Sequence, residues 1–402
     1  MDPRELSIFD LTYDLPPDRI TSHPLAERDA SKLLVYRDGA IADHIFRDLP
    51  SLLPGNSLLI MNNTRVINAR IVMQRDSGAR IEILVTGPAD GSPIGSVADR
   101  SEGIEMRAMI GNARRWKSGE TLRLKSADLV LEADRTDHDM VRFNWHPDRL
   151  TFAEVLERIG HVPLPPYMSR ADEIGDRERY NTVIAKHEGS IAAPTASLHF
   201  TPEMLSRMQD RSIDRAEVTL HVGAGTFLPV KADRMAGHEM HAEHVRIPLD
   251  TLVALSDRVG NGPIIPVGTT ALRTIESIYW HGVSILAGKG GDRMQVDQWE
   301  PYGSPDRSLR PAEALAAVID RIRSTGGDEL SGTTRLLIAP GYRFRYADAL
   351  ITNFHQPQST LLLLVAAFVG DDWRKIYDHA LMNDYRFLSY GDGSLLWRAD
   401  VR

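Results

Sequence analysis

The chain has 402 residues, of which 42% are hydrophobic and 25% charged, and its formal net charge is −8. This length and balance are typical of a soluble globular protein with one large domain or two ordinary ones. Because the sequence contains no cysteine, disulfides, thiolate metal sites and a cysteine nucleophile are excluded. The negative charge argues against a general nucleic-acid coat protein, since phosphate neutralisation supplies most non-specific affinity.

Neither a signal sequence nor a membrane span is evident. The first residues, MDPRELSIFDL, lack a basic region followed by an apolar one. The longest apolar run, 361–369, is far too short to cross a bilayer. We therefore expect a cytoplasmic protein, and we expect a monomer.

The first 67 residues combine a hairpin with an apolar strand. Asp38–Gly39 suits the turn between two short strands. The run 57–61 predicts a further strand, and Asn62, Thr64 and Arg65 follow it directly. Amide and guanidinium groups at a strand end are typical of a hydrogen-bonding rim for a nucleotide, although asparagine is also a common turn residue.

Between residues 68 and 150 the pattern changes to short alternating runs separated by Gly, Ser, Asp and Pro. Six such runs with little helical periodicity predict a small antiparallel β-barrel. A helical pattern resumes at Thr151, which has capping-box spacing to Glu154. We therefore predict an all-β barrel domain, residues 68–150, inserted into a discontinuous α/β domain made of residues 1–67 and 151–402. The six runs lie at 70–74, 80–87, 103–111, 121–126, 129–134 and 140–145.

Strands and helices alternate after residue 151, which predicts α/β packing. Thr201–Pro202 has the form of an N-cap followed by proline at the first helical position. The predicted strand 263–267 leads through Gly268 and Thr269 into a helix, whose N-terminal amides suit an anionic or carbonyl oxygen. Residues 281–332 are rich in Gly, Ser, Asp and Arg around one helical stretch, and we predict a partly helical surface insertion there.

Two motifs combine a histidine with small residues. In EGSIAAPTASLHF, residues 188–200, His199 stands between two large apolar side chains. In EVTLHVGAGTF, residues 217–227, a predicted strand carries His221 at its end and runs into a glycine-rich loop. A strand that ends in this way presents a base to a ligand in many sites, whereas a core strand followed by a glycine turn needs no function.

Together these motifs resemble the S-adenosylmethionine:tRNA ribosyltransferase-isomerase family of queuosine biosynthesis. Two departures from the family are visible. Ser197 occupies a position where the family usually has glycine, and the family lacks most of the segment between about Trp280 and Gly332. Other stretches agree with the family in the same order: IMNNTRVINARI at 60–71, GHVPLPPYMSR at 160–170, PVGTTALRTIES at 266–277, ALITNFHQPQSTLLLLV at 349–365 and YRFLSYGD at 385–392.

The resemblance implies a reaction and its partners. The ribosyl moiety of S-adenosylmethionine is transferred to 7-aminomethyl-7-deazaguanine at the tRNA wobble position and isomerised. The expected products are epoxyqueuosine in the tRNA, adenine and methionine. S-adenosylmethionine is thus the ribosyl-donor substrate, the second substrate is a tRNA with a GUN anticodon, and no metal and no membrane are expected. The resemblance also implies that the α/β domain is the catalytic one and that the β-barrel is inserted into it.

This reaction defines what the site must contain. A base must remove a C5′ proton next to the sulfonium, donors must stabilise the departing adenine, and the modified base must be held outside the anticodon stack. We expect His221 to be the base and His199 to be the second candidate, with Glu276 a weaker one. We expect the site to be one concave surface and Ser197 to keep a negative φ with activity retained. The expected substrate-binding residues are Asn62, Thr64, Arg65, Thr195, Gly223, Gly225, Phe227, Thr269, Arg273, Asn353, Phe354, His355 and Asp392.

Two other functions stay open at this point. His238, His241 and His244 lie within seven residues together with two glutamates, which suggests a metal-dependent hydrolase, although His-x-x-His alone is a weak signal. A non-catalytic tRNA-binding relative is the second alternative, in which Ser197 marks a degraded site.

Overall fold

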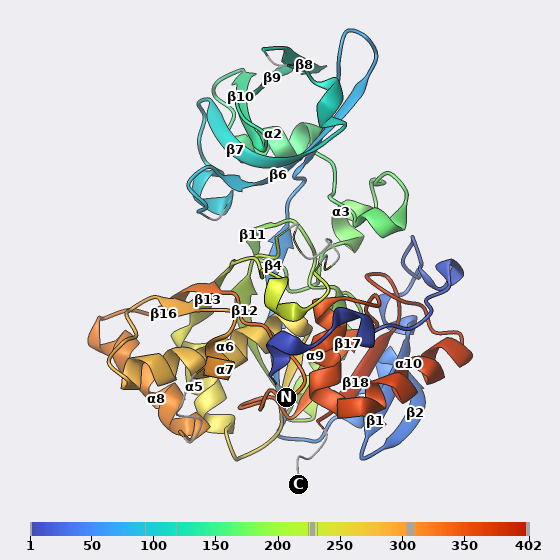
Figure 1. Ribbon diagram of the computed structural model, residues 1–402, viewed down its shortest axis with the longest axis vertical. Coiled ribbons are helices and arrows are strands. Elements are labelled where there is room, and N and C mark those ends of the chain that lie inside the picture. The colour runs from blue at the N-terminus through green and yellow to red at the C-terminus, as the bar shows by residue number, and fades with distance from the viewer. Residues whose placement is uncertain are drawn as a thin grey trace.

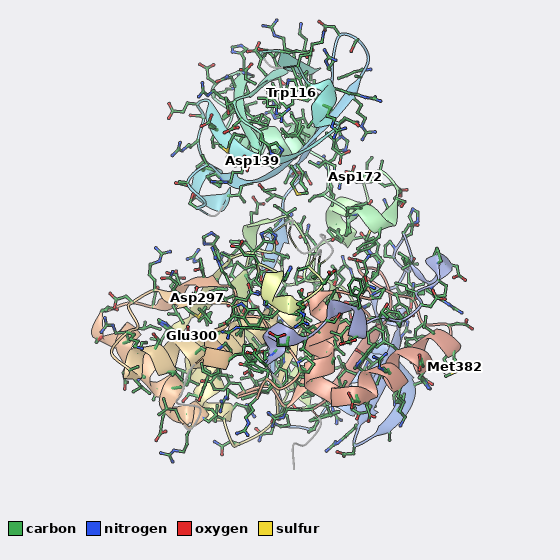
Figure 2. The ribbon with its side chains drawn as sticks, in the orientation of Figure 1. Trp116, Asp139, Asp172, Asp297, Glu300 and Met382 are labelled. Atoms are coloured by element: carbon green, nitrogen blue, oxygen red, sulfur yellow. The ribbon has the colours of Figure 1, made fainter. Side chains whose placement is uncertain are left out.

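The computed structural model describes residues 2–92, 94–117, 119–223, 225, 230, 232–303 and 309–398. The fold is mixed α/β, with a large sheet and a nearly closed antiparallel sheet of six strands (Figure 1). The two sheets form separate bodies, with Trp116 and Asp139 on the upper one and Asp297, Glu300 and Met382 on the lower one (Figure 2). Within the described ranges, no helix has the length and apolar character needed to cross a membrane.

The large sheet is organised around β3 (Leu58–Asn62), whose residues are all buried. It pairs in parallel with β12 (Asp214–Leu220) on one side and β14 (Ile264–Val267) on the other, and β14 pairs in parallel with β17 (Ala349–Asn353). A parallel strand with neighbours on both sides is apolar along its whole length. The carboxyl ends of these four strands therefore lie at the same edge of the sheet. The full order is β15 (Met294–Val296), β16 (Glu329–Thr334), β13 (Glu243–Pro248), β12, β3, β14, β17, β18 (Gly393–Trp397), β1 (Lys32–Arg37) and β2 (Ala40–Ile45).

Helices cover both faces of this sheet. Because side chains alternate along a strand, Ile60 of β3 packs in one core while Leu59 and Met61 pack in another. The first core contains α5 (Leu249–Arg258), α6 (Thr269–Leu286), α8 (Pro311–Ser324), α9 (Thr360–Val369) and α10 (Trp373–Met382). The second contains α1 (Leu49–Leu52) and α4 (Pro202–Asp210), and Thr201 caps α4 as the sequence predicts.

The six predicted barrel strands are all present. The six strands share one hydrophobic core, which contains the inward residues of each strand together with Trp116. Helix α2 (Phe152–Ile159) begins with the predicted capping box of Thr151 and Glu154, but its apolar face packs into this second body and not into the large-sheet cores. Residues 152–159 therefore pack with the six-stranded sheet and not with the large one. The strand order is β5 (Arg70–Gln74), β6 (Arg80–Pro88), β7 (Ile104–Gly111), β10 (Met140–His146), β9 (Leu129–Arg135) and β8 (Thr121–Ser126).

The segment 281–332 differs in part from the expected surface insertion. It lies at one edge of the large sheet, as an insertion would, and supplies β15 and β16 to that sheet. Helix α8 buries Leu315, Val318 and Ile322 in the first core of the large sheet. It approaches α6 so closely that a Cβ at Gly282 would stand 2.1 Å from the backbone oxygen of Ala314. The segment is therefore part of the core as well as of the surface.

Ser197 adopts the backbone conformation expected of it. It lies in the 3₁₀ turn Thr195–Ser197 and is not among the described residues with positive φ. The side chain is fully buried, and its hydroxyl has no hydrogen-bond partner in the described part of the chain. A buried hydroxyl without a partner is destabilising, so the serine has an energetic cost at this position.

We expect Ser197→Ala to raise the free energy of unfolding by up to about 1 kcal/mol, because it removes an unsatisfied buried hydroxyl. Ser190→Ala is the matched control. The Ser190 hydroxyl donates to the Ala192 carbonyl at 2.8 Å and accepts from the Val222 amide at 2.9 Å. Its loss should cost roughly 1–3 kcal/mol. Urea unfolding measures the free energy of unfolding of both variants. An equal loss of stability in the two would contradict this account.

Candidate functional site

A hollow that we call the main cavity opens beside the carboxyl ends of β14 and β17. It measures about 790 Å³ including its mouth. Three segments far apart in the sequence form its walls: 192–196, 268–270 and 352–356. The cavity therefore brings together five of the expected substrate-binding residues, namely Thr195, Thr269, Asn353, Phe354 and His355.

Two helix N-termini open into the main cavity. Gly268 takes φ +91° to turn the chain from β14 into α6, and Thr269 and Thr270 stand at the start of that helix. The Thr270 hydroxyl is buried and has no partner among the described residues. Ser359, the N-cap of α9, lines the cavity as well. The N-terminus of a helix favours an anionic or carbonyl oxygen.

The polar wall of the cavity comes from the end of β17. Asn353 is 2% exposed, its Nδ2 lies 3.3 Å from His199 Nε2, and its Oδ1 has no hydrogen-bond partner in the described residues. His355 Nε2 lies 2.9 Å from the Thr352 hydroxyl. Burial lowers the pKa of His355 to about 4, so its imidazole is neutral at pH 7. A neutral imidazole and an unused amide oxygen thus face the same space.

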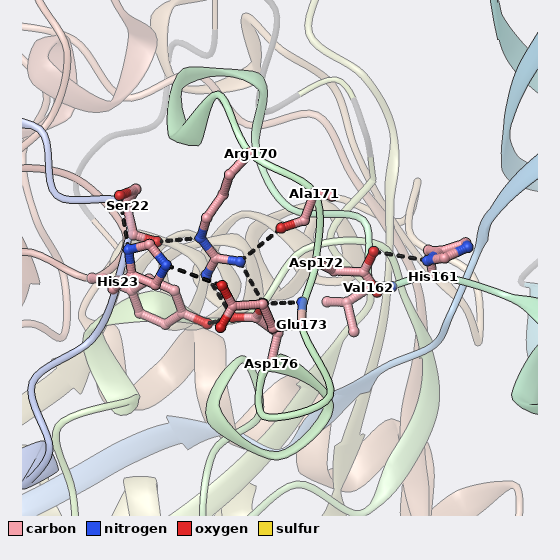
Figure 3. Close-up of polar contacts among 10 residues, drawn as sticks. Ser22, His23, His161, Val162, Arg170, Ala171, Asp172, Glu173 and Asp176 are labelled. Carbon is pink, nitrogen blue, oxygen red and sulfur yellow. Dashed lines mark hydrogen bonds and ion pairs between the residues drawn. The ribbon is translucent and has the colours of Figure 1, made fainter. Parts of the chain in front are cut away.

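An ion-pair network around Arg170 lies next to another part of the cavity lining, at Tyr167 (Figure 3). Arg170 donates to both carboxylate oxygens of Asp176, at 2.6 and 2.8 Å, and to the Ser22 carbonyl. Bidentate pairing of this kind fixes geometry as well as adding energy. It anchors the segment that carries Tyr167, whose hydroxyl lies 2.5 Å from Ser389 Oγ at the cavity wall.

His199 lies behind the main cavity and does not line it. Its Nδ1 is 2.7 Å from the Ser31 hydroxyl, and its ring packs against Phe46 with centroids 4.6 Å apart. Burial lowers the pKa of His199 to about 4. Through Asn353 it contacts the polar wall, so it can orient that amide.

His221 also lies outside the residues that line the main cavity. Its Nδ1 is 2.9 Å from the Thr64 hydroxyl, and its ring packs on Gly189, where an added Cβ would stand 3.0 Å from Cε1. Thr64 and Gly189 belong to β4 (Thr64–Val66) and β11 (His187–Ser190), a small parallel pair. Burial, then His244 and His187, lower the pKa of His221 to about 4.

A second hollow, the joint cavity, lies between these two strands on one side and α2 with the 3₁₀ turn Ile94–Val97 on the other. It is lined by Arg65, Glu188, Arg177 and Phe152, among others, and measures about 970 Å³ including its mouth. Arg65 Nε is 3.6 Å from Glu188, and both side chains are at least half exposed. The joint cavity is therefore an accessible, mixed-charge surface between the two bodies.

Arg273 lines a third hollow, the side cavity, about 1,010 Å³ in volume including its mouth. Glu243 lines it too and forms a buried ion pair with Arg273 at 2.6 Å. Gly225 stands on the rim, where a Cβ would meet the His241 ring at 2.1 Å. The side cavity adjoins the main cavity, because Ser359 and Leu361 line both.

The remaining expected residues are held by bonds within the fold. Asn62 Nδ2 donates to the Leu220 carbonyl, and its Oδ1 accepts from the Leu220 amide. Asp392 accepts from the Lys32 amide and from Arg386. Gly223 lies next to Val222, which lines the main cavity, and Phe227 lies outside the described residues. The expected residues are thus divided between three hollows and the structural bonds around them.

Glu276 is likewise occupied inside the fold. Its carboxylate accepts from the Tyr342 hydroxyl and from the backbone amides of Arg345, Tyr346 and Ala347. Burial raises the pKa of Glu276, and these hydrogen bonds oppose the shift. It does not line any of the three cavities.

Several cavity residues were not among those expected. Tyr167, Thr270, Ser359 and Ser389 line the main cavity. All four lie inside stretches that carry the family resemblance, so a signal was present in the sequence. Their side chains meet only through contacts between distant segments, as the 222-residue separation of Tyr167 and Ser389 illustrates.

The histidine cluster does not form the expected metal geometry. His238 and His241 line the side cavity, whereas His244 lies on β13 and its Nε2 is 3.0 Å from the Gly91 carbonyl of the other body. The backbone from 238 to 242 is not helical, so the helical i, i+3 arrangement of His238 and His241 is absent. Within the described ranges, no group of three or more His, Asp or Glu side chains is placed to hold a metal ion.

Comparison with known proteins identifies the family. The chain matches the family model of the queuosine biosynthesis protein over residues 8–396. It is 41% identical over 398 residues to the S-adenosylmethionine:tRNA ribosyltransferase-isomerase of Azoarcus sp., covering 98% of this chain and 99% of that protein. The enzyme of the same name from Thiobacillus denitrificans is 39% identical over 400 residues, with 98% and 99% covered. A crystal structure of the S-adenosylmethionine tRNA ribosyltransferase from Thermotoga maritima is 27% identical, covers 96% of this chain and 99% of that chain, and gives a TM-score of 0.47. The chain therefore belongs to the queuosine biosynthesis protein family.

Proposed function

We propose that this chain transfers and isomerises the ribosyl moiety of S-adenosylmethionine onto 7-aminomethyl-7-deazaguanine at the wobble position of a GUN-anticodon tRNA. Epoxyqueuosine remains in the tRNA, and adenine and methionine are released. The observation that supports this most is the main cavity, where a neutral imidazole, an unused amide oxygen and two helix N-termini meet in a chain of this family. The large-sheet body is then the catalytic domain, and the six-stranded sheet is an inserted one.

The adenosyl part of the donor fits the main cavity. The free Oδ1 of Asn353 suits the exocyclic amino group of adenine, because a buried acceptor without a donor is costly. The amides and hydroxyls at Thr269 and Thr270 suit negative charge on the departing base, which preorganised donors stabilise most in a water-poor site. Adenine release is the step that these groups assist.

His355 is our candidate for the base that removes the C5′ proton. A general base must come within hydrogen-bond reach of that proton, and His355 is the imidazole among the residues lining the main cavity. Its Nε2 faces Thr352, so Nδ1 is the nitrogen left for the substrate. His221, the base expected from the sequence, lies at the joint cavity side of the fold beside Thr64. There it fits a role in holding the tRNA.

The joint cavity is our candidate for the tRNA side of the site. Arg65 and Arg177 line this hollow and carry guanidinium groups that suit phosphate, and an unstacked nucleotide would enter from the space between the two bodies. Ser197 lines neither this hollow nor the main cavity, which supports retained activity over a degraded, merely tRNA-binding relative.

The test is to incubate the full chain with S-adenosylmethionine and tRNA carrying 7-aminomethyl-7-deazaguanine. We expect adenine and methionine to appear in equal amounts, and the tRNA to gain the mass of the transferred ribosyl group. Release of S-adenosylhomocysteine instead would show methyl transfer and contradict the proposal. Turnover that survives exhaustive chelation separates this reaction from a metal-dependent hydrolase.

A further inference from the structure

A buried ion pair with an unused donor forms part of the side cavity wall. Arg273 of α6 and Glu243 at the start of β13 are each 5% exposed. Arg273 Nη1 donates to Glu243 Oε2 at 2.6 Å, and Nε donates to the Leu336 carbonyl at 3.1 Å. The third nitrogen, Nη2, is buried and has no hydrogen-bond partner among the described residues. Unpaired buried donors are rare in proteins, so this one points to a ligand.

The carboxylate beside it narrows the chemistry of that ligand. Glu243 Oε1 accepts no hydrogen bond from the residues that the structure describes, while Oε2 is bound to Arg273. A planar guanidinium fork suits a carboxylate, and the neighbouring Glu243 oxygen suits an ammonium group. A phosphate dianion would face the Glu243 charge at close range, which is unfavourable. The pair therefore matches a zwitterion.

We infer that the side cavity is a subsite for an α-amino acid and that it takes the methionyl end of S-adenosylmethionine. This assignment rests on the proposed function. The α-carboxylate binds Arg273 Nη2, and the α-ammonium group binds Glu243 Oε1. Because Ser359 and Leu361 line both cavities, the methionyl chain can pass between them while the adenosyl part stays in the main cavity.

The segment 281–332 supports this subsite. Gln298 Nε2 donates to the His238 carbonyl at 2.7 Å, and its Oε1 accepts from the Met240 amide at 2.8 Å. Both bonds fix the stretch that carries His238 and Met240, which line the side cavity. A polar side chain from the segment thus holds one wall of the amino-acid subsite in place.

The first arm of the test changes the ligand and leaves the protein intact. Decarboxylated S-adenosylmethionine keeps the adenosyl group, the sulfonium and the ammonium but lacks the carboxylate. We expect kcat/KM for adenine release to fall about 10- to 100-fold relative to S-adenosylmethionine, as loss of a charged hydrogen bond to a buried guanidinium implies. Equal use of the two donors, within threefold, would overturn the subsite.

The second arm uses Arg273→Gln, with Arg335→Gln as the matched control. Arg335 is half exposed, lies 3.7 Å from Glu239 and does not line the side cavity. We expect Arg273→Gln to lose its preference for S-adenosylmethionine over the decarboxylated donor, because the group that reads the carboxylate is gone. The Arg335 variant should keep that preference. A preference kept by Arg273→Gln, or lost in both variants, would overturn the assignment.

Two further measurements distinguish failure of the proposed function from failure of the amino-acid subsite. If the parent releases no adenine from S-adenosylmethionine, the proposed function fails. If it does so but ignores the carboxylate, only the amino-acid subsite fails. Free methionine should compete with S-adenosylmethionine for the parent, and inorganic phosphate should not. Competition by phosphate alone would assign the side cavity to a phosphate and overturn the inference.

Discussion

His355→Ala should lower the rate of adenine release by roughly 10²–10⁴-fold, the usual loss when a general base is removed. The residue lines the main cavity, and its position is fixed by Thr352 at Nε2 and by the Tyr377 hydroxyl, which accepts from the His355 amide at 3.1 Å. Burial holds the pKa of His355 near 4, so the imidazole is unprotonated above about pH 5. The kcat/KM of the parent should therefore stay level from pH 8 to pH 5 and fall only below that.

His221→Ala is the comparison that decides between the two candidate bases. We expect this variant to raise the KM for tRNA with a smaller change in kcat, because His221 contacts Thr64 near the joint cavity and not the main cavity. Binding of S-adenosylmethionine by calorimetry should be unchanged in both variants. If His221→Ala loses adenine release and His355→Ala keeps more than a tenth of it, His221 is the base and the main-cavity assignment of the proton transfer is wrong.

The features that could be predicted from the sequence are those written in local patterns. Alternation of period two marked all six strands of the antiparallel sheet, and Thr151 and Thr201 marked the starts of two helices. Gly268 and Thr269 at the end of a predicted strand correctly indicated a helix N-terminus. Each of these signals depends on residues only a few positions apart, so a single sequence contains it completely.

The composition of the cavities depends on contacts between distant positions. Asn62 and Asp392 look like binding residues from their motifs, but each is bound to backbone amides far away in the sequence, as the 360-residue separation of Lys32 and Asp392 shows. A motif reveals that residues matter without telling whether they bind a substrate or the protein itself. His221 and His355 likewise follow strands of one sheet, but His355 lines the main cavity whereas His221 packs against Thr64 and Gly189.

Residues 281–332 show a second reason why the structure differs from the expectation based on sequence. Gly, Ser, Asp and Arg in the connections favoured a surface segment, and among the described residues Gly288, Gly291 and Gly326 do lie outside its helices and strands. The apolar face of α8, with Leu315, Val318 and Ile322 at helical spacing, was nevertheless readable as a buried face. What no pattern shows is the partner of that face, which is α6 at Gly282.

Glu276→Ala should reduce the free energy of unfolding by roughly 3–5 kcal/mol. The substitution leaves the buried backbone amides of residues 345–347 without an acceptor and removes the partner of the Tyr342 hydroxyl. Each such unsatisfied group costs about 1–3 kcal/mol, and relaxation of the loop recovers part of the sum. Urea unfolding monitored by tryptophan fluorescence measures the loss.

Glu276→Gln and Glu102→Ala complete the comparison. The glutamine keeps one acceptor oxygen but turns an amide donor toward the loop, so its cost should be intermediate, about 1–3 kcal/mol. Glu102 is exposed, and its replacement should change stability by less than about 0.5 kcal/mol.

The same three variants distinguish a structural role of the Glu276 carboxylate from a catalytic one. A structural Glu276 predicts a variant that unfolds more easily yet turns over normally per folded molecule, because the carboxylate lines none of the three cavities. A variant of parental stability with a hundredfold loss of adenine release would instead make Glu276 part of the chemistry.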